Sequence, residues 1–99
     1  MHIIRVFAFA TTALAALTGS AFSADAPPGA PSCTGCHPVT KSVATPVPRL
    51  NGRDAAQIVT AMTEFRTGKR ATTVMDRIAK GFNDDETKAI AAWFAAQKD

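Results

Sequence analysis

The chain has 99 residues, of which 46% are hydrophobic, 19% are charged and 7% are aromatic. This length allows one small domain, and a formal net charge of +3 at pH 7 is too small to indicate a nucleic-acid partner. A domain of this size buries little surface, so it usually needs a metal, a cofactor or a partner subunit for stability.

Residues 1–23 have the pattern of a secretory signal peptide. His2 and Arg5 lie in a short leading region, an apolar run covers residues 6–17, and small residues follow. Cleavage after Ser23 is favoured, and it leaves a mature domain of residues 24–99. The apolar run is shorter than the ~20 residues of a spanning helix, so a retained anchor is the weaker alternative and no membrane span is expected after cleavage. The leader has no twin arginine, which indicates Sec-type export to the periplasm.

A proline-rich arm precedes the most informative motif of the chain. Residues 24–32 contain three prolines and a glycine, so only a single helical turn is expected here, with Ser32 as its cap. The pentapeptide Cys33-Thr34-Gly35-Cys36-His37 then has the C-x-x-C-H spacing of covalent haem attachment. Two thiols one turn apart reach the two vinyl groups of one porphyrin, and the next residue presents an imidazole to the iron.

Three other interpretations of Cys33 and Cys36 are weaker. A redox dithiol normally opens a helix in a βαβ unit, and no strand-like alternation flanks this motif. A structural zinc site needs four ligands, whereas the mature chain offers only the two cysteines and His37. A disulfide between the two cysteines would close too small a loop to stabilise much.

The rest of the chain is predicted to be a loop followed by helices. Prolines keep the stretch from His37 to Leu50 irregular, and Pro46 is a candidate to accept a hydrogen bond from the ring of His37. A helix is then expected from Asp54 to a C-terminal Gly68, and a short one from Asp76 to Lys80. The apolar face of the longer helix contains Ile58, Met62 and Phe65.

The last segment is predicted to be a second long helix. Asn83 and Glu86 form a capping-box pattern at its start, and Lys98 lies at its end. Its buried face is expected to contain Ile90, Trp93 and Phe94.

The second axial ligand of the iron decides between electron transfer and ligand chemistry. The mature chain has no second histidine, which leaves Met62 and Met75. Met62 is in phase with the apolar face of a helix, so we interpret it as core. Met75 lies in a connector whose shape a haem can determine, so we predict that its thioether binds the iron opposite His37.

Four segments together resemble class I c-type cytochromes. These segments are Cys33–His37, Pro48–Leu50, Glu64–Gly68 and Thr72–Phe82. Within the last of them, the stretch Met75–Phe82 is similar to the cytochrome subunit of flavocytochrome c sulfide dehydrogenase. The resemblance covers most of the mature chain and implies an all-α, small class I cytochrome c fold. Because only nine residues of the mature chain precede Cys33, its N-terminal helix is expected to be truncated.

The same resemblance implies a cofactor and a partner. Residues 24–99 would form a monohaem domain, with one haem c bound covalently by Cys33 and Cys36 and with His37 and Met75 as axial iron ligands. The chain would be an electron-transfer subunit rather than an enzyme, in a heterodimer with an FAD-containing subunit that oxidises sulfide. It would pass electrons to a downstream acceptor. The sequence has no G-x-G-x-x-G motif after a strand-like segment, so the flavin is expected on the partner.

Two other functions remain open at the level of sequence. One is a free, diffusible monohaem cytochrome c that shuttles electrons. The other is a haem enzyme or gas sensor with an open distal site, which requires that Met75 does not bind the iron.

Overall fold

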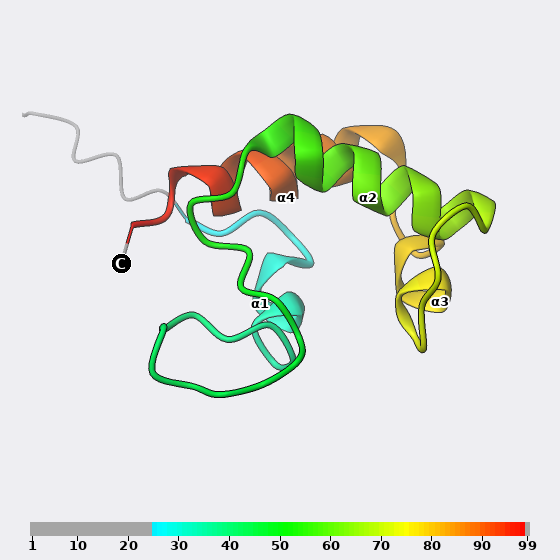
Figure 1. The fold of residues 1–99 in the computed structure, drawn as a ribbon. Helices are drawn as coiled ribbons and strands as arrows, with labels where there is room; N and C mark the ends of the chain where they lie inside the picture. Colours follow the sequence, from blue (N-terminus) through cyan, green and yellow to red (C-terminus); the bar gives the residue numbers. More distant parts are fainter. Residues whose placement is uncertain (1–24, 99) are drawn as a thin grey trace, which may run out of the picture.

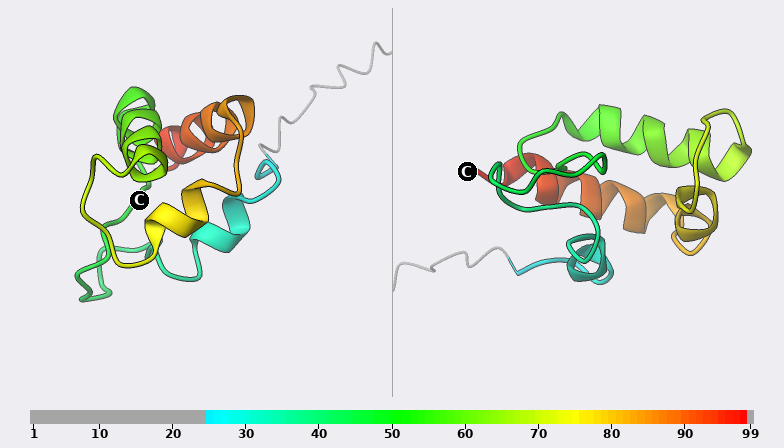
Figure 2. Two further views of the ribbon diagram at one scale, coloured as in Figure 1. Left: turned by 90° about the vertical axis from the view of Figure 1, so that its right-hand side faces the viewer. Right: turned by 60° about the horizontal axis from the view of Figure 1, so that its bottom comes forward.

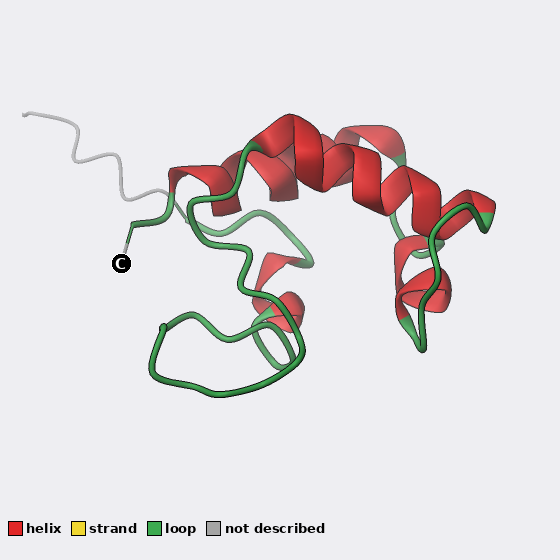
Figure 3. Cartoon of the chain, in the orientation of Figure 1, coloured by secondary structure: helices red, strands yellow, loops and turns green. Residues whose placement is uncertain are grey.

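Four α-helices form the regular secondary structure of residues 25–98, the part of the chain that this computed structural model describes (Figure 3). They are α1 (Ala30–Cys33), α2 (Ala55–Thr67), α3 (Met75–Ala79) and α4 (Asp84–Ala96). Residues 25–98 contain no strand, so the predicted all-α class is confirmed. Over the same residues, none of the helices is both long and apolar enough to span a bilayer. The signal peptide predicted for residues 1–23 lies outside the described part.

The two long helices form one layer, and the two short ones lie on the same side of it (Figures 1 and 2). Helix α2 begins where the side chain of Asp54 accepts a hydrogen bond from the amide of Gln57 at 3.1 Å. It ends at Gly68, whose φ of 76° lets its amide reach the carbonyls of the last turn. Both boundaries agree with the sequence prediction.

Helix α4 begins with the predicted capping box. The amide of Glu86 donates to Asn83 Oδ1 at 2.8 Å, and the amide of Asn83 donates to Glu86 Oε1 at 3.0 Å. Two amides that the helix cannot satisfy internally are thus paired at its first turn.

Replacing Asn83 with alanine removes one of these two bonds. We expect a loss of about 1 kcal/mol in the free energy of unfolding, measured by denaturant titration of the native protein. Asn83→Asp keeps an acceptor oxygen at the same position and serves as the control. Equal losses in the two variants would contradict a capping role.

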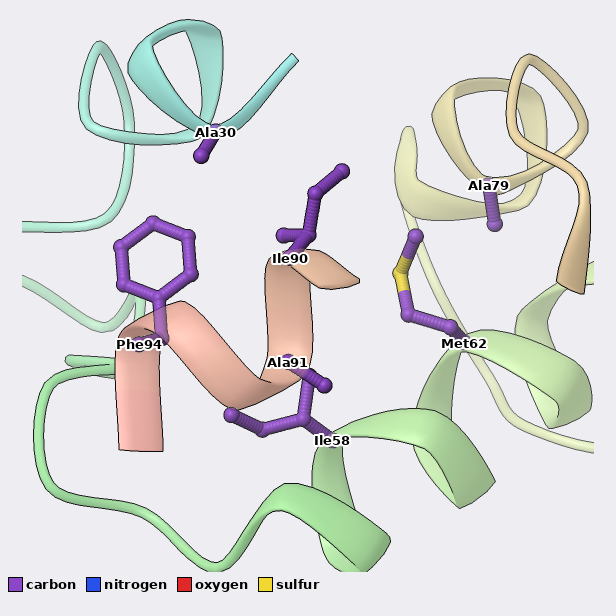
Figure 4. Packing of buried hydrophobic residues seen from close by; sticks show 7 residues of the cluster. All are labelled: Ala30, Ile58, Met62, Ala79, Ile90, Ala91 and Phe94. Carbon is purple, nitrogen blue, oxygen red and sulfur yellow. The ribbon is translucent and has the colours of Figure 1, made fainter. Parts of the chain in front are cut away.

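The core joins all four helices (Figure 4). Its buried apolar residues are Ala30, Ile58, Met62, Ala79, Ile90, Ala91 and Phe94. Ile58 and Ala91 pack α2 against α4, whereas Met62 points from α2 toward Ala79 of α3. Met62 is only 9% exposed, which confirms its interpretation as a core residue.

Helix α1 is a single turn, which confirms the expected truncation of the N-terminal helix. Its N-cap is Gly29 and not Ser32, which lies inside the helix. The prediction of a Ser32 cap was wrong because its hydroxyl donates backwards to the carbonyl of Gly29 at 2.6 Å instead of accepting from an amide ahead. Ala30 packs on Ile90 and Phe94, so α4 covers the turn that carries the cysteine motif.

Candidate functional site

The C-x-x-C-H motif begins at the last residue of α1 and continues into the turn after it. Cys33 is the last residue of the helix, and its carbonyl accepts hydrogen bonds from the amides of Cys36 at 3.2 Å and His37 at 2.9 Å. Both cysteines are free thiols; Cys33 is half-buried and Cys36 is exposed. One turn therefore carries two thiols and an imidazole, which is the arrangement that covalent attachment of a porphyrin needs.

The thiol of Cys33 is held in its protonated form. Burial raises the pKa of Cys33, and its Sγ donates a weak hydrogen bond to the carbonyl of Gly29 at 3.6 Å. Formation of a thioether adds the sulfur and its hydrogen across a vinyl double bond, so it consumes the thiol without a change in total charge. A neutral thiol at Cys33 is consistent with thioether formation on a porphyrin.

The ring of His37 has a defined tautomer. Nδ1 lies 2.5 Å from the carbonyl oxygen of Pro48, and because a carbonyl only accepts, Nδ1 carries the proton. This leaves the lone pair of Nε2 for a metal, and the carbonyl fixes the orientation of the ring.

The expectation that Pro46 supplies this carbonyl was wrong. Pro46 and Val47 lie in a bend, which the amide of Val47 closes by donating to Thr45 Oγ1 at 3.2 Å. The partner of His37 is Pro48, the first residue after this bend. The bond between Thr45 and Val47 determines where the bend ends, and therefore which proline carbonyl faces His37. The positions of the prolines in the sequence do not show this bond.

The two ends of the loop after His37 are connected by hydrogen bonds. The carbonyl of Val39 accepts from Arg49 Nη2 at 3.2 Å and from Asn51 Nδ2 at 3.3 Å. Arg53 Nε donates to the carbonyl of Arg49 at 2.7 Å, and the amide of Gly52 donates to the carbonyl of Phe94 at 3.0 Å. These bonds connect both ends of the loop to each other and to α4, and so hold the carbonyl next to His37.

Met75 lies on a separate segment. It is the half-buried first residue of α3, which starts and ends one residue earlier than predicted. The amide of Met75 donates to Thr72 Oγ1 at 2.8 Å, and this bond begins the helix at the methionine. Helices α1 and α3 lie on the same side of the α2–α4 layer (Figures 1 and 2), so Met75 and the motif belong to one side of the molecule.

Sequence reasoning missed an apolar surface in these two segments. The exposed large hydrophobic side chains of the described residues are Val39, Val43, Val74 and Ile78. Two of them follow His37 in the loop, and the other two flank Met75. An apolar group held between the loop and α3 would cover surface of this kind, which is costly to leave in water. The residues present therefore fit a porphyrin bound through the motif turn.

Comparisons with known proteins point to the same chemistry. No family model matches the chain. It is 38% identical over 63 residues to the cytochrome subunit of sulfide dehydrogenase of Chlorobaculum tepidum, covering 64% of this chain and 57% of the relative. It is also 35% identical over 66 residues to cytochrome c-552 of Acidithiobacillus ferridurans, covering 67% of this chain and 29% of the relative. A thiosulfate dehydrogenase electron acceptor of Stutzerimonas stutzeri is 36% identical over 71 residues, covering 70% of this chain and 33% of the relative.

The chain is similar to c-type cytochromes, and its all-α fold agrees with class I of these proteins, a class that implies a haem c cofactor. Within this class it resembles the cytochrome subunit of sulfide dehydrogenase. The chain spans 57% of that relative and about a third or less of the other two, so similarity covers only part of each.

Proposed function

We propose that this protein is a periplasmic electron-transfer subunit that carries one covalently bound haem c and accepts electrons from an FAD-containing sulfide dehydrogenase subunit. The observation that carries the proposal is the histidine held by a backbone carbonyl beside two free thiols, on one turn. The similarity to a cytochrome subunit of sulfide dehydrogenase supports the choice of partner.

Each residue of the site has a distinct role in this proposal. Cys33 and Cys36 would form the thioethers, and His37 would bind the iron through Nε2 because Nδ1 is engaged by Pro48. Met75 would supply its thioether sulfur as the second protein ligand. When bound, the haem supplies a one-electron redox centre, and histidine with methionine as axial ligands gives such a centre a high potential.

The catalytic step belongs to the partner in this proposal. Nothing in the sequence has the glycine-rich pattern that binds a dinucleotide, so FAD and the sulfide site are assigned to a second subunit. A heterodimer is also the simplest way to support a domain with a core of seven buried apolar residues, three of which are alanines. The electron then leaves to a downstream acceptor.

A second candidate function is that of a free, diffusible cytochrome c. Two of the relatives are named as electron acceptors of thiosulfate dehydrogenase. A carrier of this kind would be stable and reversibly redox-active without a bound flavoprotein.

The two functions are separated by isolating the haem-loaded chain from its own source under native conditions. If the chain is a subunit of the complex, the isolated material should contain one FAD per haem, measured by flavin fluorescence, and sulfide should reduce the haem. The purified chain alone, with the flavoprotein removed, should stay oxidised under the same conditions. A folded haem monomer without flavin that cycles reversibly would contradict the subunit assignment and support the free carrier.

A further inference from the structure

Gly29, at the start of α1, is in unusually close contact with an aromatic ring. Its φ is 92°, and a Cβ atom at this position would meet Cε1 and Cζ of Phe82, the latter at 3.0 Å. Cδ1 of Ile90 would lie 3.4 Å away. Carbon atoms normally approach to about 3.5–4.0 Å, so the ring fits against α1 only because residue 29 has no side chain.

Phe82 is held firmly to the segment that contains Met75. Its amide donates to the carbonyl of Ala79, the last residue of α3, at 3.3 Å. Its carbonyl accepts from Arg66 Nη1 of α2 at 3.2 Å. The same guanidinium bonds Asp84 Oδ1 at 2.5 Å and thereby lowers the pKa of that carboxyl. The backbone of Phe82 is thus a fixed extension of α3, anchored to α2, and it carries the ring to Gly29.

The carbonyl of Gly29 is hydrogen-bonded to the residues that begin the cysteine motif. It accepts from the amide of Ser32 at 3.2 Å, from Ser32 Oγ at 2.6 Å and from Cys33 Sγ at 3.6 Å. The carbonyl of Cys33 in turn accepts from the amide of His37 at 2.9 Å. A displacement of residue 29 is therefore passed on to the turn that carries the histidine.

We propose that the contact between Gly29 and the ring of Phe82 sets the spacing between the segment that carries His37 and the segment that carries Met75. Gly29 is then a positioning residue for the distal ligand, although it binds neither the haem nor the iron itself. This inference rests on the proposed role of the two residues as axial ligands. A methyl group at residue 29 pushes α1 away from α3 and lengthens the gap that the thioether of Met75 must close.

The test compares two alanine substitutions in the haem-loaded protein. Gly29→Ala and Gly68→Ala both place a Cβ at a positive φ, but Gly68 has nothing within 4 Å of that atom. Both variants share the backbone strain, and only the first meets the ring. We expect Gly29→Ala to keep its covalent haem, lose the long-wavelength charge-transfer absorption of methionine-ligated ferric haem and show a lowered reduction potential. Gly68→Ala should retain the band and the wild-type potential.

A double variant separates the contact from folding in general. Leucine lacks the Cε1 and Cζ atoms, so Gly29→Ala with Phe82→Leu should regain the absorption band, or regain the fold if the single variant does not fold. Retention of the band in Gly29→Ala would overturn the proposal. Equal loss in Gly68→Ala, or no rescue by Phe82→Leu, would also overturn it. Absence of the band from the wild type would instead refute the assignment of Met75, and the inference with it.

Discussion

Replacing Met75 with alanine is expected to leave the haem covalently attached and, if Met75 is the proposed ligand, to open the iron to added ligands. Met75 lies on α3, apart from the turn that carries both cysteines, so its loss leaves the attachment chemistry intact. Axial ligands set haem potentials over a range of about 0.8 V, and the loss of a thioether should lower this one by on the order of 0.1 V. The measurements are the charge-transfer absorption of the ferric form, the reduction potential and binding of carbon monoxide to the ferrous form.

The matched control for this variant is Met62→Leu. Met62 is the other methionine of residues 24–99 and is buried between α2 and α3. A volume-conserving change in the core should cost less than about 1.5 kcal/mol and leave the iron spectrum unchanged. Retention of the absorption band in Met75→Ala, or its loss in Met62→Leu, would show that Met75 is not the ligand. An open distal site in the wild type would favour a haem enzyme or gas sensor.

Cys36→Ala should abolish stable covalent attachment of the haem and with it most of the folded population. Phe94 is the one large side chain that is fully buried among the described residues, so the polypeptide core is small. Domains of this size rarely gain more than about 3–5 kcal/mol from such a core, and the haem would supply much of the missing apolar contact. Haem-stained denaturing gels report the attachment, and far-ultraviolet circular dichroism reports the remaining helix.

Thr34→Ala is the control within the same motif. The hydroxyl of Thr34 donates to the carbonyl of Pro31 at 2.7 Å, and the residue occupies one of the two variable positions between the cysteines. This variant should keep a wild-type level of bound haem. Normal haem staining of Cys36→Ala in a denaturing gel would contradict the thioether assignment.

The parts of the fold that follow from local chemistry could be predicted from the sequence. The ends of α2 and the start of α4 depend on a cap within three residues or on a terminal glycine, at Asp54, Gly68 and Asn83. The single turn of α1 follows from the short proline-rich arm. The spacing of the cysteines likewise places two thiols and His37 together whatever the rest of the chain does.

The remaining features depend on individual side-chain bonds within a loop or on contacts between distant residues. The partner of His37 is Pro48 because of a bend closed by a threonine side chain, and α3 starts at Met75 because Thr72 reaches its amide. The fit of Phe82 against Gly29 joins residues far apart in the chain. Periodicity does not show which of several loop hydroxyls bonds a nearby amide, nor how the segments that carry Gly29 and Phe82 meet in space.

The packing of Ala30 on Phe94 has a consequence for how the protein matures. These residues lie near opposite ends of the described chain, whereas α2 and α4 are separated in sequence only by α3 and its two flanking loops. Contacts between residues close in sequence form first because they lose less chain entropy. We therefore expect the α2–α4 pair to assemble while the cysteine turn is still undocked. The thiols would then stay accessible to the attachment machinery until the haem itself completes the fold.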